Sequence, residues 1–140
     1  MKLLARRDFA GRELHARLVS LGFASDAIAA ILHELAEERL LDEVRFTENY
    51  VAYHARRGQG PVRIAASLEA LGVPQPLIAA ALAAGPDWTA LARAARARRF
   101  GPRAPHSWAE RARQGRFLQY RGFSADHIRS ALDQDSSLDE

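Results

Sequence analysis

A short hydrophobic segment that ends in a glycine turn occurs three times along the chain, at intervals of fifty residues. It reads LVSLGF at 18–23, LEALGV at 68–73 and LQYRGF at 118–123. Four positions are identical in all three copies, two within the segment and two after it. They are Leu18, Leu68 and Leu118; Gly22, Gly72 and Gly122; Ile28, Ile78 and Ile128; and Leu32, Leu82 and Leu132. A repeat of this period is typical of an array of similar structural units.

The apolar residues inside each unit have helical spacing. Leu14, Leu18 and Leu21 follow the i, i+4, i+7 pattern, and the apolar residues after the turn follow the same pattern. The glycine between them suits a left-handed helix C-cap, which is costly for a residue with a Cβ. A new helix is then expected to start at the residues that favour helix N-termini, which are Ser25, Pro74 to Pro76 and Ser124.

A third helix precedes each of these helix pairs. In the second copy Phe46, Tyr50 and Tyr53 share one helical face, and the helix is expected to stop at RRGQGP, residues 56–61. In the third copy the helix is expected at about 87–100. In the first copy only MKLLARR, residues 1–7, is available, so a short, truncated first helix is expected.

The predicted fold class is therefore all-α, because no stretch alternates with the period of a strand. We expect a tandem, elongated array of three three-helix, helix-turn-helix-like repeats. The repeats are expected at 1–41, 42–85 and 86–133, followed by an acidic tail at 134–140.

The composition indicates a soluble, cytoplasmic protein. The 140 residues include 48% hydrophobic residues, enough for a core without staples, and no cysteine. No apolar stretch reaches the length of a membrane span, and Lys2 leads into a charged segment rather than a signal peptide.

No catalytic or metal-binding pattern is found. HELAE at 33–37 has Glu37 where a zinc-protease helix needs a second histidine, and the five histidines are scattered over the three repeats. GQGP at 58–61 lacks the Gly-Lys-Ser/Thr ending of a phosphate loop and is interpreted as a helix break. Trp88 and Trp108 are expected to be packing anchors. We therefore expect no enzyme activity, no cofactor and no metal.

Sequence-specific DNA reading is also disfavoured. A recognition helix needs polar side chains near its N-terminus to reach base edges. The helices after the first two turns offer mainly alanine and core residues, and only the third offers His127, Arg129 and Ser130.

Positive charge is concentrated in the third repeat. Residues 93–132 contain ten arginines against Glu110 and Asp126, giving +8, whereas residues 1–48 carry −2. Such a surface favours contact with a phosphate backbone or an acidic protein, although for any single arginine a solvated helix face is the better explanation. The candidate contact residues are Arg56, Arg57, Arg63, Arg96, Arg98, Arg99, Arg103, Arg111, Arg113, Arg116, Arg121 and Arg129.

The run LLDEVRFTENYVAYHARRGQGPVRIAASLEALGV at 40–73 closely resembles the central signature of the RecX family, bacterial regulators of the RecA recombinase. It contains the Asp-x-x-Arg-Phe start at Asp42, Arg45 and Phe46 and the Gly-x-Gly-Pro break at 58–61. Residues 3–23 and 116–132 resemble the first and last family repeats.

The resemblance implies a curved, non-catalytic helical array that binds in the groove of the RecA filament on single-stranded DNA. It also implies hindered filament growth and reduced ATP hydrolysis, strand exchange and coprotease activity. We expect a monomer with weak direct binding to DNA and no membrane partner. The assignment of the family's basic contact positions to the arginines above is an inference.

Two other classes stay open. A helical module that binds nucleic acid non-specifically without RecA predicts tight, salt-sensitive binding to bare DNA. A purely structural adaptor predicts no dependence on DNA.

Overall fold

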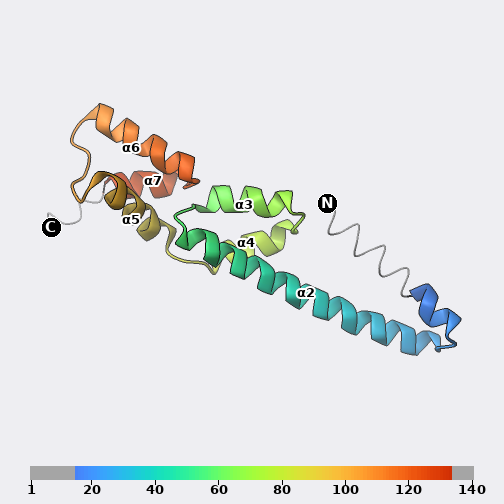
Figure 1. Ribbon diagram of the computed structural model, residues 1–140. Coiled ribbons are helices and arrows are strands. Elements are labelled where there is room, and N and C mark those ends of the chain that lie inside the picture. Colours follow the sequence, from blue (N-terminus) through green and yellow to red (C-terminus); the bar gives the residue numbers. More distant parts are fainter. Residues whose placement is uncertain (1–14, 134–140) are drawn as a thin grey trace.

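A computed structural model describes residues 15–133, and within that range every regular element is a helix (Figure 1). The helices are α2 (Ser25–Arg56), α3 (Pro61–Ala70), α4 (Gln75–Ala83), α5 (Trp88–Phe100), α6 (Trp108–Arg121) and α7 (Ala125–Leu132). Residues 15–20 are also helical. The all-α prediction is confirmed, while the predicted helix at 1–7 and the acidic tail at 134–140 lie outside the described residues.

The three glycine turns have the predicted left-handed conformation. Gly22, Gly72 and Gly122 have φ values of 86°, 88° and 99°. In the third copy the N–H of Phe123 donates to the carbonyl of Leu118 at 3.1 Å, which is the long hydrogen bond of a Schellman C-cap. Each turn therefore satisfies the last carbonyls of one helix and starts the next helix within a few residues.

The long helix α2 joins the first two units. Its 32 residues continue without a break across the predicted boundary between residues 41 and 42, and at 1.5 Å per residue it spans about 48 Å. Only its C-terminal part packs against α3 and α4 (Figure 1). The chain is therefore elongated, with a single rigid helix running from the first turn into the second unit.

The second and third units share one hydrophobic core. In the second unit α2, α3 and α4 bury Val51, Ile64, Leu68 and Ile78, and in the third unit α5 packs against α6 and α7 around residues such as Leu118. The same cluster of buried side chains extends from one unit to the other. The two units therefore form one body.

The Gly-x-Gly-Pro segment is the backbone junction between these two units. The N–H of Gly60 donates to the carbonyl of Arg121 at 2.8 Å, and the N–H of Val62 donates to that of Gly122 at 2.9 Å. A Cβ on Gly60 would lie 2.5 Å from the backbone of Gly122, and one on Gly122 would collide with the Cβ of Arg63. The segment is a helix break, as predicted, and it also docks the turn of the third unit.

Only one of the two tryptophans has the predicted packing role. Trp88 is an anchor: it is 9% exposed, and its indole N–H donates to the carbonyl of Leu82 at 3.1 Å. Trp108 is 86% exposed, so its predicted packing role is wrong. The reason is its register, because Trp108 lies roughly 100° around α6 from the buried stripe of Gln114 and Leu118.

No helix in the described part of the chain is both long enough and apolar enough to cross a membrane.

Candidate arginine-rich interface

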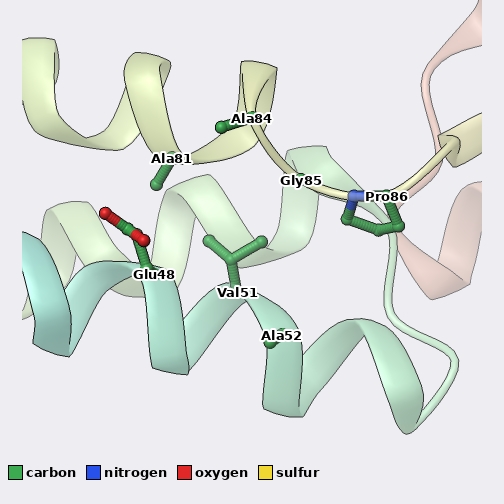
Figure 2. A pocket seen from close by; sticks show the side chains of 7 residues that line it. All are labelled: Glu48, Val51, Ala52, Ala81, Ala84, Gly85 and Pro86. Atoms are coloured by element: carbon green, nitrogen blue, oxygen red, sulfur yellow. The ribbon is translucent and has the colours of Figure 1, made fainter.

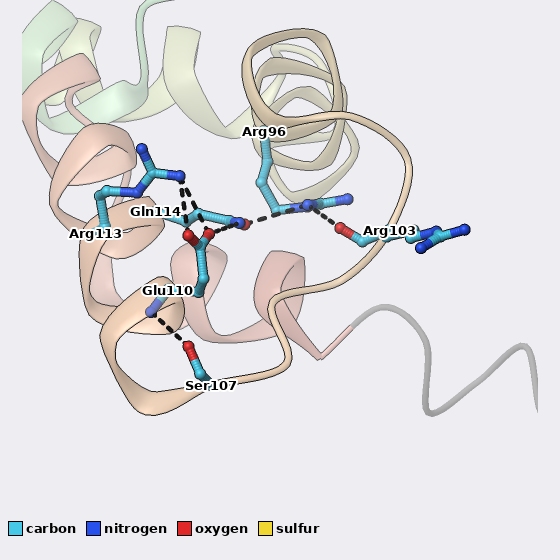
Figure 3. Close-up of polar contacts among 6 residues, drawn as sticks. All are labelled: Arg96, Arg103, Ser107, Glu110, Arg113 and Gln114. Carbon is cyan, nitrogen blue, oxygen red and sulfur yellow. Dashed lines mark hydrogen bonds and ion pairs between the residues drawn. The ribbon is translucent and has the colours of Figure 1, made fainter.

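Arg96 is buried, which removes it from the predicted contact surface. Its exposed fraction is 0%. One terminal nitrogen donates to the carbonyl of Arg103 at 2.9 Å and to Oε1 of Gln114 at 3.2 Å (Figure 3). The other donates to the carbonyl of Pro102 at 3.3 Å. Arg96 therefore holds the loop between α5 and α6, and its assignment as a filament or DNA contact is corrected.

A signal in the sequence could have identified this role. Trp88, Ala92 and Arg96 follow one another at intervals of four residues, and all three are buried in α5. That spacing places Arg96 on the inward stripe of the helix. Its partner Gln114 occupies the position of Ile64 in the second repeat, so a polar residue at an apolar repeat position marked the same site.

The hydrogen bonds continue from Gln114 to the surface. The amide nitrogen of Gln114 donates to Glu110 at 3.1 Å, and Arg113 donates to both oxygens of Glu110 at 3.1 and 3.2 Å (Figure 3). Ser107 caps the same turn by accepting from the Glu110 N–H at 3.1 Å. The hydrogen bonds from Gln114 and then Arg113 lower the pKa of Glu110. The amide of Gln114 therefore connects the carboxylate of Glu110 with the buried guanidinium of Arg96.

Three predicted arginines have carboxylate partners. Arg111 lies 2.7 Å from Asp133. Arg113 lies 3.1 Å from Glu110, and Arg129 lies 3.1 Å from Asp126. These ion pairs neutralise part of the positive charge of the third unit. The three arginines are accordingly weaker candidates for contact with a polyanion.

Eight other predicted arginines have no carboxylate within ion-pair distance among residues 15–133, and we refer to them as the arginine surface. They are Arg56, Arg57, Arg63, Arg98, Arg99, Arg103, Arg116 and Arg121. Arg121 is half-buried and the others are exposed. Their charge is therefore available to a partner.

Aromatic rings position several of these guanidinium groups. Arg99 and Arg121 lie over the ring of Phe117, with Cζ to centroid distances of 5.7 and 5.3 Å. Phe117 meets Phe100 edge to face at 5.4 Å, and Arg113 lies 5.1 Å over Phe100. These cation–π contacts hold the arginines of α5 and α6 against one another without neutralising them.

The junction connects this cluster with the basic residues of the second unit. A Cβ on Gly58 would lie 3.4 Å from a guanidinium nitrogen of Arg121. Arg63, on α3, lies over the ring of Tyr120 at 5.6 Å and donates to its carbonyl at 3.5 Å. Arg57 lies over Tyr53 at 5.4 Å. The structure thus brings Arg63, Arg99 and Arg121 to the place where the two units meet.

The remaining features do not resemble a catalytic or ligand site. Within residues 15–133 no group of histidine and carboxylate side chains could hold a metal. A depression of about 290 Å³ lies between α2 and the end of α4 (Figure 2). Its lining is Glu48, Val51, Ala52, Ala81, Ala84, Gly85 and Pro86, with a single ionisable group and no second polar side chain to orient a ligand.

Comparison with known proteins gives the same family as the sequence signature. A family model described as RecX, second three-helix domain, matches residues 42–82, and one described as RecX, third three-helix domain, matches residues 87–132.

Relatives match over most of their length. A protein of Halorhodospira halophila is 48% identical over 132 residues, covering 94% of this chain and 82% of the relative. Proteins of Ectopseudomonas mendocina and Chromohalobacter salexigens are 44% and 43% identical, with 91% and 94% of this chain and 86% and 87% of the relatives covered. All three are named regulatory protein RecX. The chain belongs to the RecX family.

Proposed function

We propose that this protein is an inhibitor of the RecA recombinase that binds in the groove of the RecA filament on single-stranded DNA. In this role it limits filament extension, ATP hydrolysis and strand exchange. The observation that carries the proposal is the identity of 48% to a regulatory protein RecX over 94% of the chain. The absence of a catalytic pattern in the sequence is in keeping with a protein that acts by binding.

The shape and charge of the molecule support this mode of action. The long helix α2 separates the first turn from the second and third units, so that one molecule can contact more than one subunit of a helical filament. The third unit, with +8 over residues 93–132, faces DNA phosphates or acidic RecA surface, and the first unit, with −2 over residues 1–48, faces basic RecA residues.

Inhibition follows from such a bridge. A rigid body fixed to neighbouring subunits resists the movements that accompany ATP turnover, because those movements would break its contacts with one of them. The same body at the growing end of the filament blocks the addition of the next subunit. Both effects require binding only, with no chemical step on the protein.

Binding to the RecA filament on single-stranded DNA, compared with binding to the same DNA without RecA, tests this proposal. The proposal predicts much tighter binding to the filament. Equal or tighter binding to bare DNA would favour the alternative, a helical module that binds nucleic acid without RecA. The arginine surface, uncompensated by carboxylates in the described residues, is the observation that keeps this alternative in view.

The arginine surface gives the matched variants for this experiment. Arg98→Glu together with Arg116→Glu reverses two exposed charges that lack a carboxylate partner within the described residues. The pair is expected to weaken binding and inhibition. Arg111→Glu together with Arg129→Glu makes the same change in charge at arginines already paired with Asp133 and Asp126, and is expected to have a smaller effect. If the first double variant inhibits at the wild-type concentration, the basic surface does not contribute.

A further inference from the structure

Helix α6 exposes two large aromatic side chains on the outside of the third unit. Trp108 is 86% exposed and Tyr120 is 76% exposed, the two highest values among the large hydrophobic side chains of the described residues. Tryptophan and tyrosine are normally largely buried, so two such rings on one short helix are a candidate interaction surface.

The side chains between the two rings are basic. Arg113, Arg116 and Tyr120 follow the i, i+3, i+7 pattern of one helical face. Trp108 lies at the start of the same helix, about 120° around the axis from Tyr120 and roughly 18 Å along it. Arg116 lies between the two rings, about 80° around the axis from Trp108 and about 40° from Tyr120. A flexible polyanion that winds about a third of a turn around α6 would therefore meet Trp108, the guanidinium of Arg116 and Tyr120 in turn.

Tyr120 is held in place from the neighbouring unit. Arg63 lies over its ring at 5.6 Å and donates to its carbonyl at 3.5 Å, yet the side chain keeps most of its surface open. The ring is therefore oriented before a ligand arrives, which lowers the entropy cost of stacking on it.

These features favour one class of partner. Duplex DNA offers phosphates but keeps the faces of its bases stacked inside, and an acidic protein offers carboxylates without flat π-faces. A single strand offers both phosphates and unstacked bases, which bind arginines and aromatic rings respectively. At about 3.4 Å per nucleotide the distance between the rings corresponds to roughly five stacked nucleotides.

We infer that the exposed surface of α6 that carries Trp108, Arg116 and Tyr120 is a binding surface for single-stranded nucleic acid, in which bases stack on Trp108 and Tyr120 and Arg116 contacts phosphate. This goes beyond the proposed regulation of RecA and shares with it only the contact of the basic third unit with a polyanion.

The fluorescence of Trp108 tests the stacking directly. The chain has two tryptophans, so Trp88→Phe leaves Trp108 as the only indole. Titration with oligothymidylate and oligouridylate of about 15 nucleotides, a length within the usual range of single-strand sites, is expected to quench Trp108 emission. The two probes show whether DNA or RNA is preferred. The same length of duplex and polyglutamate, at equal charge concentration, are expected to leave the emission nearly unchanged.

Binding measured by anisotropy of labelled oligothymidylate provides a second test that keeps Trp88 intact. Trp108→Ala and Tyr120→Ala are each expected to weaken binding roughly 5- to 150-fold, the range for loss of one stacked base. Phe46→Ala, which removes an exposed ring 45% accessible on α2, is the control and is expected to leave the affinity unchanged.

Three results would overturn the inference: no quenching by a single strand, equal quenching by duplex or polyglutamate, or unchanged affinity in both α6 variants. The outcome is separable from that of the proposed function. Inhibition of RecA without Trp108 quenching removes only the stacking surface, whereas quenching without any effect on RecA removes only the proposed regulation.

Discussion

Replacement of Arg96 by methionine tests whether this buried arginine stabilises the third unit through its hydrogen bonds. The change removes the charge and three hydrogen bonds while keeping an unbranched side chain of similar length. The carbonyls of Pro102 and Arg103 belong to exposed residues and can turn to water. Gln114 is only 3% exposed and loses the donor to its Oε1. Stranding that oxygen costs about 1–3 kcal/mol.

A second contribution has the opposite sign. The Nε of Arg96 is buried without a hydrogen-bond partner among residues 15–133, so removal of the guanidinium also removes an unsatisfied polar atom. The two effects together give an expected loss of about 2 kcal/mol for Arg96→Met. Arg96→Ala, which also leaves a cavity, is expected to lose about 4 kcal/mol.

Urea unfolding followed by far-UV circular dichroism measures these differences. Arg98→Met, an exposed change on the same helix, is the control and is expected to stay within about 0.5 kcal/mol of wild type. The double variant Arg96→Met with Gln114→Leu replaces both buried polar partners. Its loss of unfolding free energy is expected to be at least about 1 kcal/mol smaller than the sum of the losses in the two single variants. A loss for Arg96→Met equal to that of Arg98→Met, or strict additivity in the double variant, would refute the buried role.

Three further outcomes are expected. Gly122→Ala should destabilise the protein by clearly more than the ~1–2 kcal/mol of conformational strain, because its new Cβ meets the backbone of Arg63. Gly22→Ala, with a similar φ and no atom of residues 15–133 within 4 Å of the new Cβ, measures the strain alone in thermal unfolding. Carboxyl NMR titration should place the pKa of Glu110 below 4.5, and Gln114→Leu should raise that pKa. Because folding lowers the pKa, ionised Glu110 stabilises the folded protein at a pH above the unfolded-state pKa, and this stabilisation is lost as the pH falls through the folded-state pKa. A pKa at or above 4.5 in the wild type would contradict these hydrogen bonds. Affinity for single-stranded DNA should fall linearly on a logarithmic salt scale, and an affinity independent of salt would exclude phosphate contacts.

The repeat allowed most of the fold to be predicted. The recurrence of leucine and glycine at fifty-residue intervals located the turns, and Gly22, Gly72 and Gly122 have the left-handed conformation expected of them. The end of α2 at the GQGP segment was likewise visible, since Pro and Gly interrupt helices for local steric reasons. The helix expected at about 87–100 is α5, which ends at Phe100.

The candidate site was harder to predict from the sequence, because it depends on which face of each helix packs against the neighbouring helices. Arg96 was predicted to be a surface contact because it is charged, but it lies on the buried stripe of α5 with Trp88 and Ala92. Trp108 was predicted to pack in the core because it is large and apolar, but its position on α6 faces solvent. The docking of Gly60 on the turn at Gly122 joins segments about sixty residues apart, and no local pattern reports such a contact.

The rate of DNA-dependent ATP hydrolysis by RecA, measured as this protein is added to filaments on single-stranded DNA, shows whether the protein inhibits RecA. We expect the rate to fall progressively at protein concentrations below that of RecA, because each molecule restrains neighbouring subunits and blocks extension. An unchanged rate at several-fold excess over RecA would contradict the proposed inhibition.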